Sequence, residues 1–146
     1  MTTAISILQA YCSVLDYLDK YYLKTYSDDI GDLAGDMHFI QDGRTVDDAA
    51  WNDWLRAIHK VKPSLIVNQN ENVSLTINEA YSAMIYFLEN YAYLTNSAET
   101  RKLLDEIMAL KDGKPVDQEN WNEWMLSVKK ILAQKPLIKP LLILTK

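Results

Sequence analysis

The feature that most restricts the fold of this 146-residue chain is an internal duplication. Residues 7–61 align with residues 77–131 without a gap, and 16 of the 55 aligned positions are identical. The repeat is clearest in VDDAAWNDWLRAI, which begins at Val46, and VDQENWNEWMLSV, which begins at Val116. A period of 70 residues is about twice that of the common two-helix repeats, so we expect each copy to be a three-helix unit.

Apolar residues in each copy recur at spacings of three and four, which is the pattern of a helix with one buried face. This pattern predicts a helix over residues 4–23 and another over residues 76–93. Polar residues that can accept hydrogen bonds from the free amides of a first helical turn indicate where helices begin. The predicted N-caps are Ser27, Asp47, Thr76, Ser97 and Asp117. The pairs Asp42–Gly43 and Asp112–Gly113 predict turns, because glycine accepts left-handed backbone.

Together these patterns predict an all-α fold of two tandem three-helix units within one compact domain over residues 1–146. The copies are expected at about residues 4–62 and 75–134, joined by a linker at 63–74 that is rich in Asn and Gln. We expect the apolar C-terminal tail, residues 135–146, to dock on the body or to contact another chain, since its side chains are costly in water. No strand of consequence is expected.

The third predicted helix of each copy carries two tryptophans, Trp51 and Trp54 in the first copy and Trp121 and Trp124 in the second. In each copy the apolar residues continue at three- and four-residue spacings, which places the indole rings on a core face. We therefore predict a structural role for all four, because buried tryptophan contributes strongly to cores. The alternative is an exposed aromatic patch that binds a ligand or a partner.

The composition excludes several partners and locations. A net charge of −5 and a pI near 4.9 disfavour direct binding to nucleic acid or to an anionic membrane, since both need a basic surface. No uninterrupted apolar run approaches the roughly 20 residues of a membrane span, and no basic region of a secretory signal precedes the first apolar stretch. The single cysteine, Cys12, is compatible with a reducing compartment. We expect a cytoplasmic protein.

No segment carries a specific catalytic, cofactor-binding or metal-binding motif such as a phosphate loop, a cysteine pair or a nucleophile elbow. His38 and Asp42 lie four residues apart and could form an acid–base pair, but Met108 replaces the histidine in the second copy. A histidine without a nucleophile or a metal partner is not an active site, so we favour a surface or helix-end role. We expect no enzyme activity, no cofactor and no metal.

Acidic residues gather in the first copy. From Ser27 to Asp53 there are eight aspartates and one arginine, a local charge of −7, whereas the matching part of the second copy is far more balanced. Asp29, Asp32 and Asp36 share one face of the second predicted helix. Helix caps explain some of the eight, but Asp32, Asp36 and Asp53 go beyond that need. Clustered like charge lowers stability, and a basic partner would relieve it, so we predict that Asp29, Asp32, Asp36 and Asp53 bind such a partner. The alternative is a solvated structural face.

Several tyrosines accompany this acidic stretch. Helical spacing places Tyr11 and Tyr22 in the core or at its boundary. It leaves Tyr17, Tyr21 and Tyr26 as predicted surface contacts to the same partner.

The run from Tyr11 through TYSDDIGDLAGDMHFIQDGRTVDDAAWNDWLRAI resembles a module of small bacterial proteins with a Ser-Asp turn, an Asp-Gly turn and an Asp-x-x-x-Trp-x-x-Trp helix. Proteins with this module resemble immunity proteins that neutralise polymorphic toxins, as in contact-dependent growth inhibition. The similarity covers each copy but not the tail. It implies a cytoplasmic inhibitor that binds one cognate toxin, often a nuclease, without catalysis. A nuclease binds phosphate through a basic cleft, which an acidic inhibitor would cover.

Two functions therefore remain open. The first is an immunity protein whose acidic face covers a basic toxin, and the second is a non-enzymatic structural or regulatory module that assembles through its apolar tail. The oligomeric state and the number of copies that contact a partner stay open. A toxin-like reading frame next to the gene would favour the first function.

Overall fold

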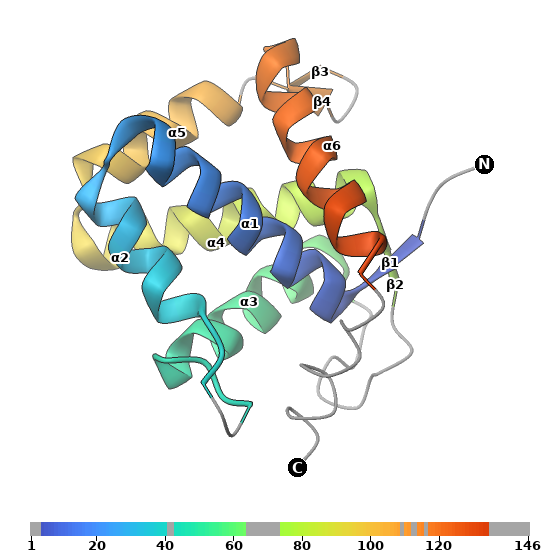
Figure 1. The fold of residues 1–146 in the computed structure, drawn as a ribbon, viewed down its shortest axis with the longest axis horizontal. Coiled ribbons are helices and arrows are strands. Elements are labelled where there is room, and N and C mark those ends of the chain that lie inside the picture. The colour runs from blue at the N-terminus through green and yellow to red at the C-terminus, as the bar shows by residue number, and fades with distance from the viewer. Residues whose placement is uncertain are drawn as a thin grey trace.

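The computed structural model describes residues 4–40, 43–63, 74–108, 110–111, 114–115 and 117–134. Within these residues the chain forms six helices and four very short strands, so the prediction of an all-α fold is confirmed (Figure 1). The helices are α1 (Ile7–Thr25), α2 (Asp28–Met37), α3 (Asp48–Val61), α4 (Ile77–Thr95), α5 (Ala98–Ile107) and α6 (Gln118–Leu132). The strands are β1 (Ala4–Ser6), β2 (Ser74–Thr76), β3 (Leu110–Lys111) and β4 (Lys114–Pro115).

The helix starts follow the predicted caps. Each cap side chain accepts a hydrogen bond from an amide of the first turn, as Ser27 does from Ile30, and Thr76 forms a capping box with Glu79. The ends of α1 and α4 also correspond, because Tyr26 and Asn96 both adopt left-handed backbone with φ of 54° and 55°. Equivalent residues of the two copies thus start and stop equivalent helices.

The first helix begins three residues later than predicted. Ala4–Ser6 form strand β1, and Ser6 caps α1 in a capping box with Gln9. Strand β1 pairs antiparallel with β2, with Ile5 opposite Leu75. Both of these side chains are buried, each 1% exposed. This pairing, which the sequence analysis missed, joins the starts of α1 and α4.

Each copy closes its first two helices into a hairpin with the same buried hydrogen bond. The hydroxyl of Tyr11 in α1 donates to the carbonyl of Met37 in α2 at 2.7 Å. The hydroxyl of Tyr81 in α4 donates to the carbonyl of Ile107 in α5 at 3.1 Å. These bonds fix the last turn of the second helix against the first.

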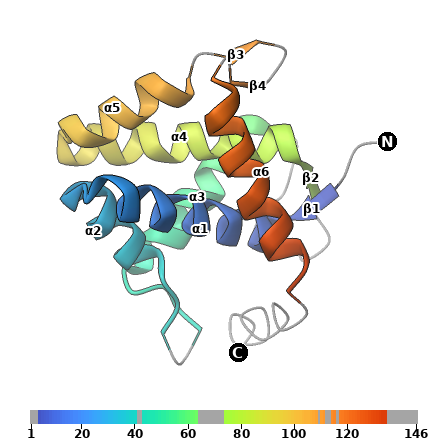
Figure 2. The same cartoon turned by 45° about the horizontal axis from the view of Figure 1, so that its top comes forward.

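The third helices cross between the copies. Helix α3 makes its most extensive helix contact with α4, and α6 makes its own with α1, an arrangement visible in Figures 1 and 2. The two sets of helices are therefore interleaved, and the expectation of two tandem three-helix units is not confirmed. The apolar face of a third helix can be buried against an apolar surface of either copy, because the hydrophobic effect is non-directional.

The tryptophans contribute to this crossed packing. Trp54 and Trp124 are fully buried, and Trp51 and Trp121 are partly buried against the same core. Trp54 lies between Tyr11 of its own copy and Phe87 of the other, with ring centroids 6.1 and 5.9 Å away. The prediction that the tryptophans are structural is borne out by their burial.

Some predictions fall on residues outside those that the structure describes. They concern Asp42, the second Asp-Gly pair at positions 112–113, nearly all of the linker, and the apolar tail at 135–146. Of the first Asp-Gly turn, Gly43 is described and has a φ of 86°, as the turn prediction required.

Candidate functional site

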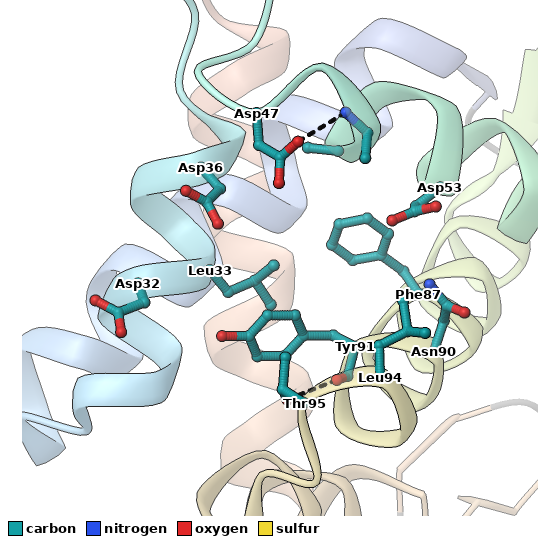
Figure 3. A pocket seen from close by; sticks show the side chains of 12 residues that line it. Asp32, Leu33, Asp36, Asp47, Asp53, Phe87, Asn90, Tyr91, Leu94 and Thr95 are labelled. Atoms are coloured by element: carbon teal, nitrogen blue, oxygen red, sulfur yellow. Dashed lines mark hydrogen bonds between the residues drawn. The ribbon is translucent and has the colours of Figure 1, made fainter.

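A cleft lies between α2, α3 and α4 (Figure 3). Its volume of about 480 Å³ falls within the range of roughly 300–1,000 Å³ that is typical of ligand sites. Its described lining consists of Asp32, Leu33 and Asp36 from α2, Asp47, Ala49, Ala50 and Asp53 from α3 and its cap, and Phe87, Asn90, Tyr91, Leu94 and Thr95 from α4. The crossed packing of α3 on α4 therefore builds this cleft from both copies.

Four carboxylates line the cleft. Asp47 is placed by capping α3, where it accepts a hydrogen bond from the Ala49 amide at 2.9 Å. The Asp47 amide also donates to the carbonyl of Asp36 at 3.0 Å, which holds the end of α2 against the start of α3. None of the described lining residues is Lys, Arg or His. The structure thus brings together three of the four predicted aspartates, Asp32, Asp36 and Asp53.

The carboxylates of the cleft repel one another. Partial burial raises the pKa of Asp36, and the nearby charges of Asp47 and Asp32 raise it further. Burial is also the main cause that raises the pKa of Asp53, although Arg56 opposes it by donating to Asp53 Oδ1 at 2.6 Å. Raised carboxyl pKa values mean that the negative charge costs free energy in the folded state. A cation in the cleft would remove part of that cost.

Apolar side chains lie beneath the carboxylates. Leu33 and Phe87 are buried, and Figure 3 shows the rings of Phe87 and Tyr91 in the space between the aspartates of α2 and α3. The hydroxyl of Tyr91 donates to the carbonyl of Asp29 at 3.1 Å, which fixes its ring. Leu94 is 67% exposed beside them. The cleft therefore combines a negative rim with an apolar floor.

Asp29, the fourth predicted aspartate, does not line the cleft. Its carboxylate accepts a hydrogen bond from the Ser97 hydroxyl at 2.5 Å, and its amide donates to Glu99 at 2.9 Å. It is half-buried at the contact between the starts of α2 and α5. These bonds give Asp29 a structural role within the chain.

The three predicted tyrosine contacts do not form one surface. The prediction for Tyr17 is wrong, because it is only 3% exposed and donates to Asn120 Oδ1 at 3.3 Å under α6. Its position looked like the polar side of α1, but α6 of the other copy covers that side. Tyr21 is half-buried, and Tyr26 is 72% exposed at the end of α1. Neither Tyr21 nor Tyr26 lines the acidic cleft.

A second hollow, of about 340 Å³, lies on the other side of α2. Asp19, Tyr22, Asp28, Gly31, Asp32, Gly35 and His38 line it. Gly31 permits the close approach of α1, because a Cβ there would lie 2.7 Å from the Tyr22 ring. Asp32 lines both hollows, so α2 forms an acidic ridge between them.

Neither His38 nor Cys12 is among the described residues that line the cleft. His38 is exposed, and its Nε2 lies 3.3 Å from Oδ2 of Asp19. Cys12 is half-buried, and burial raises the pKa of its thiol to about 12, which leaves little reactive thiolate. In the part of the chain that the structure describes, no group of three or more His, Cys, Asp or Glu side chains could hold a metal ion. Nor is any helix described here long and apolar enough to cross a membrane.

The chain was compared with protein-family models, curated proteins and solved structures, and none of them matches it.

Sequence reasoning missed the wall of the cleft that α4 provides. Asp47 was recognised only as a cap, although it also faces the other aspartates. Phe87, Tyr91 and Leu94 belong to the second copy, and no local pattern connects them with α2 or α3. A signal did exist at Leu94, since leucine replaces Lys24 at the end of the corresponding helix. An apolar residue that replaces a charged one at a helix end is a candidate contact.

Proposed function

We propose that this chain is an immunity protein that binds and neutralises a cognate toxin domain, and that the acidic cleft receives the toxin's basic surface. One observation carries the proposal. Four aspartates from α2 and α3 gather around one cleft, to which the described residues contribute no Lys, Arg or His. A basic surface is the complementary partner.

The electrostatic repulsion among these four carboxylates supports a role in binding. Like charges that are held together destabilise the compact state, and opposite charges on a partner relieve that repulsion and accelerate association. The capping role of Asp47 explains one of the four carboxylates. Asp32 and Asp36 cap no helix, and the charges of Asp47 and Asp32 raise the pKa of Asp36. Partner binding supplies a reason for a cluster that folding alone does not need.

The nature of the partner follows from the resemblance of each copy to immunity proteins of polymorphic toxins. The proposed target is a nuclease domain in the cytoplasm, because a basic phosphate-binding cleft is the surface that an acidic inhibitor would cover. Inhibition requires only that the chain occupies that surface. Catalysis by the chain plays no part in this proposal.

The experiment begins with the reading frame beside the gene. If it encodes a toxin domain, that domain is purified and its affinity for the chain is measured at low and at high salt. The triple variant Asp32→Asn, Asp36→Asn and Asp53→Asn should fold, associate more slowly and lose most of the salt dependence, since rim charges act mainly on the encounter rate.

The matched control removes three exposed acids from the second copy, by Asp105→Asn, Glu106→Gln and Glu119→Gln. Glu99 is unsuitable as a control, because its carboxylate accepts hydrogen bonds from Ser27 and from the Asp29 amide. The control should bind almost as well as the parent chain. Equal losses of affinity in the two variants would mean that net charge, rather than the cleft, controls binding. Unchanged binding in the cleft variant would refute the cleft as the site.

A further inference from the structure

The acidic cleft differs from a merely charged surface because it has depth and an apolar floor. A cation that bound only to surface carboxylates would need neither Phe87 nor the exposed Leu94 beside them. A side chain that combines an apolar stem with a positive end would use both parts of the cleft. Lysine and arginine are the two such side chains in proteins, and both bury their stems along apolar surfaces.

On the basis of the proposed function, we propose that the cleft receives one arginine side chain of the basic partner. Its aliphatic stem lies against Phe87 and Leu94, and its guanidinium lies between the carboxylates of Asp36 and Asp53. This assignment names the chemical group that the cleft recognises.

The two carboxylates come from different walls of the cleft. Asp36 comes from α2 and Asp53 from α3, and Figure 3 shows them on opposite sides of the Phe87 ring. A guanidinium carries five donors in a fixed fork, so it can bond to two carboxylates at once. Arg56 already donates to Oδ1 of Asp53 at 2.6 Å, and a carboxylate can accept a further bond at its second oxygen.

The floor favours arginine over lysine. A guanidinium is less strongly hydrated than an ammonium group and stacks on aromatic faces, which suits a cleft that contains Phe87 and Tyr91. The Tyr91 ring is held in place by the bond from its hydroxyl to the Asp29 carbonyl at 3.1 Å. An ammonium group would lose more hydration on entry and would bond to fewer acceptors.

The remaining carboxylates strengthen the attraction. Asp47 and Asp32 already repel the charge on Asp36, which, together with its burial, raises the pKa of that carboxyl. A guanidinium between the walls would oppose this repulsion at Asp36. The volume of about 480 Å³ leaves room for a long side chain together with water.

The test uses the full chain labelled with ¹⁵N and three blocked pentapeptides, Gly-Gly-X-Gly-Gly, in which X is arginine, lysine or citrulline. Citrulline has the shape of arginine without its charge. Each peptide is added up to about 10 mM, a range that captures a millimolar Kd. The arginine peptide should cause saturable amide shift changes at the cleft, the lysine peptide weaker ones, and the citrulline peptide none.

Variants locate the interaction. Asp36→Asn should weaken binding of the arginine peptide by about tenfold or more, as expected for the loss of a hydrogen bond to a charged group. Leu94→Ser, at an exposed position, should weaken binding of this peptide to a smaller extent, because it removes the contact with the aliphatic stem of arginine. Asp105→Asn on the exposed face of α5 is the control and should change nothing.

The inference is overturned if the arginine peptide gives no saturable changes at the cleft, if citrulline binds equally well, or if Asp36→Asn has no effect. Failure here differs from failure of the proposed function. If the toxin domain still binds and the triple aspartate variant still weakens it, the proposed function stands and the arginine assignment alone is wrong. If the arginine peptide binds as described but no toxin domain does, the cleft recognises arginine and the proposed function is wrong.

Discussion

The hydroxyl of Ser27, at the start of α2, donates to Oε1 of Glu99, in the first turn of α5, at 2.8 Å. The relationship is reciprocal, because the hydroxyl of Ser97 donates to Oδ2 of Asp29 at 2.5 Å. Each copy thus supplies a carboxylate to the helix start of the other. Negative charge is favourable there, since the first turn of a helix carries free amides and the positive end of the dipole.

The first prediction concerns the cap at Ser27. Ser27→Ala should lower the free energy of unfolding by about 0.5–2 kcal/mol, the usual cost of losing an N-cap. The substitution removes the bond from the Ile30 amide and the bond to Glu99. Denaturant unfolding measures the change. Ser82→Ala, inside α4 and away from any cap, is the control, and equal losses at both serines would contradict the capping role.

The second prediction is a pH dependence at Glu99. Hydrogen bonds from the Asp29 amide and the Ser27 hydroxyl lower the pKa of Glu99 in the folded state. The ionised Glu99 therefore stabilises the fold at pH values above its pKa in the unfolded chain. This stabilisation is lost as the pH falls through its lower pKa in the folded chain. Unfolding of the parent chain and of Glu99→Gln is compared between neutral and acid pH. The difference between them should shrink on acidification, and a constant difference would argue against this account.

The third prediction is that Asp36→Asn stabilises the chain at neutral pH. Burial and the charges of Asp47 and Asp32 raise the pKa of Asp36, so its ionised form costs stability above that pKa. Because the carboxyl is partly solvated, the gain should be only about 0.2–1 kcal/mol. The gain should vanish as the pH falls through the folded pKa and below the unfolded one.

Thermal unfolding at several pH values tests this third prediction. Asp105→Asn on α5 is the control, and it should change stability little at any pH. A loss of stability in Asp36→Asn at neutral pH would show that the carboxylate stabilises the fold, and it would remove the argument that the cluster exists for binding.

The fourth prediction separates two equivalent tryptophans. Trp54 and Trp124 are both fully buried, but only Trp54 has a described hydrogen bond, from its Nε1 to the Ile7 carbonyl at 3.2 Å. Trp54→Phe should therefore cost about 0.5–1.5 kcal/mol more than Trp124→Phe, the net value of one such bond. Chemical denaturation of both variants gives the comparison. The opposite order would mean that packing around the ring, rather than the hydrogen bond, decides the cost.

The local structure of this protein could be predicted from its sequence. Helix starts at Ser27, Asp47, Ser97 and Asp117 and the matching helices of the two copies were predictable, because caps and helical hydrogen bonds involve residues within about four positions of one another. The start of α1 was misplaced, since Ala4–Ser6 pair with a strand that lies 70 positions further along the chain. No local pattern reveals that partner.

How the two copies combine depends on long-range packing that no local pattern predicts. The sequence showed that α3 and α6 each have an apolar face, but hydrophobic burial is non-directional and does not specify which helix covers that face. Packing α6 on α1 buried Tyr17, and packing α3 on α4 placed Phe87 and Tyr91 beside the predicted Asp36 and Asp53. The acidic residues could therefore be recognised from the sequence, whereas the cleft that they line exists only because helices from the two copies cross.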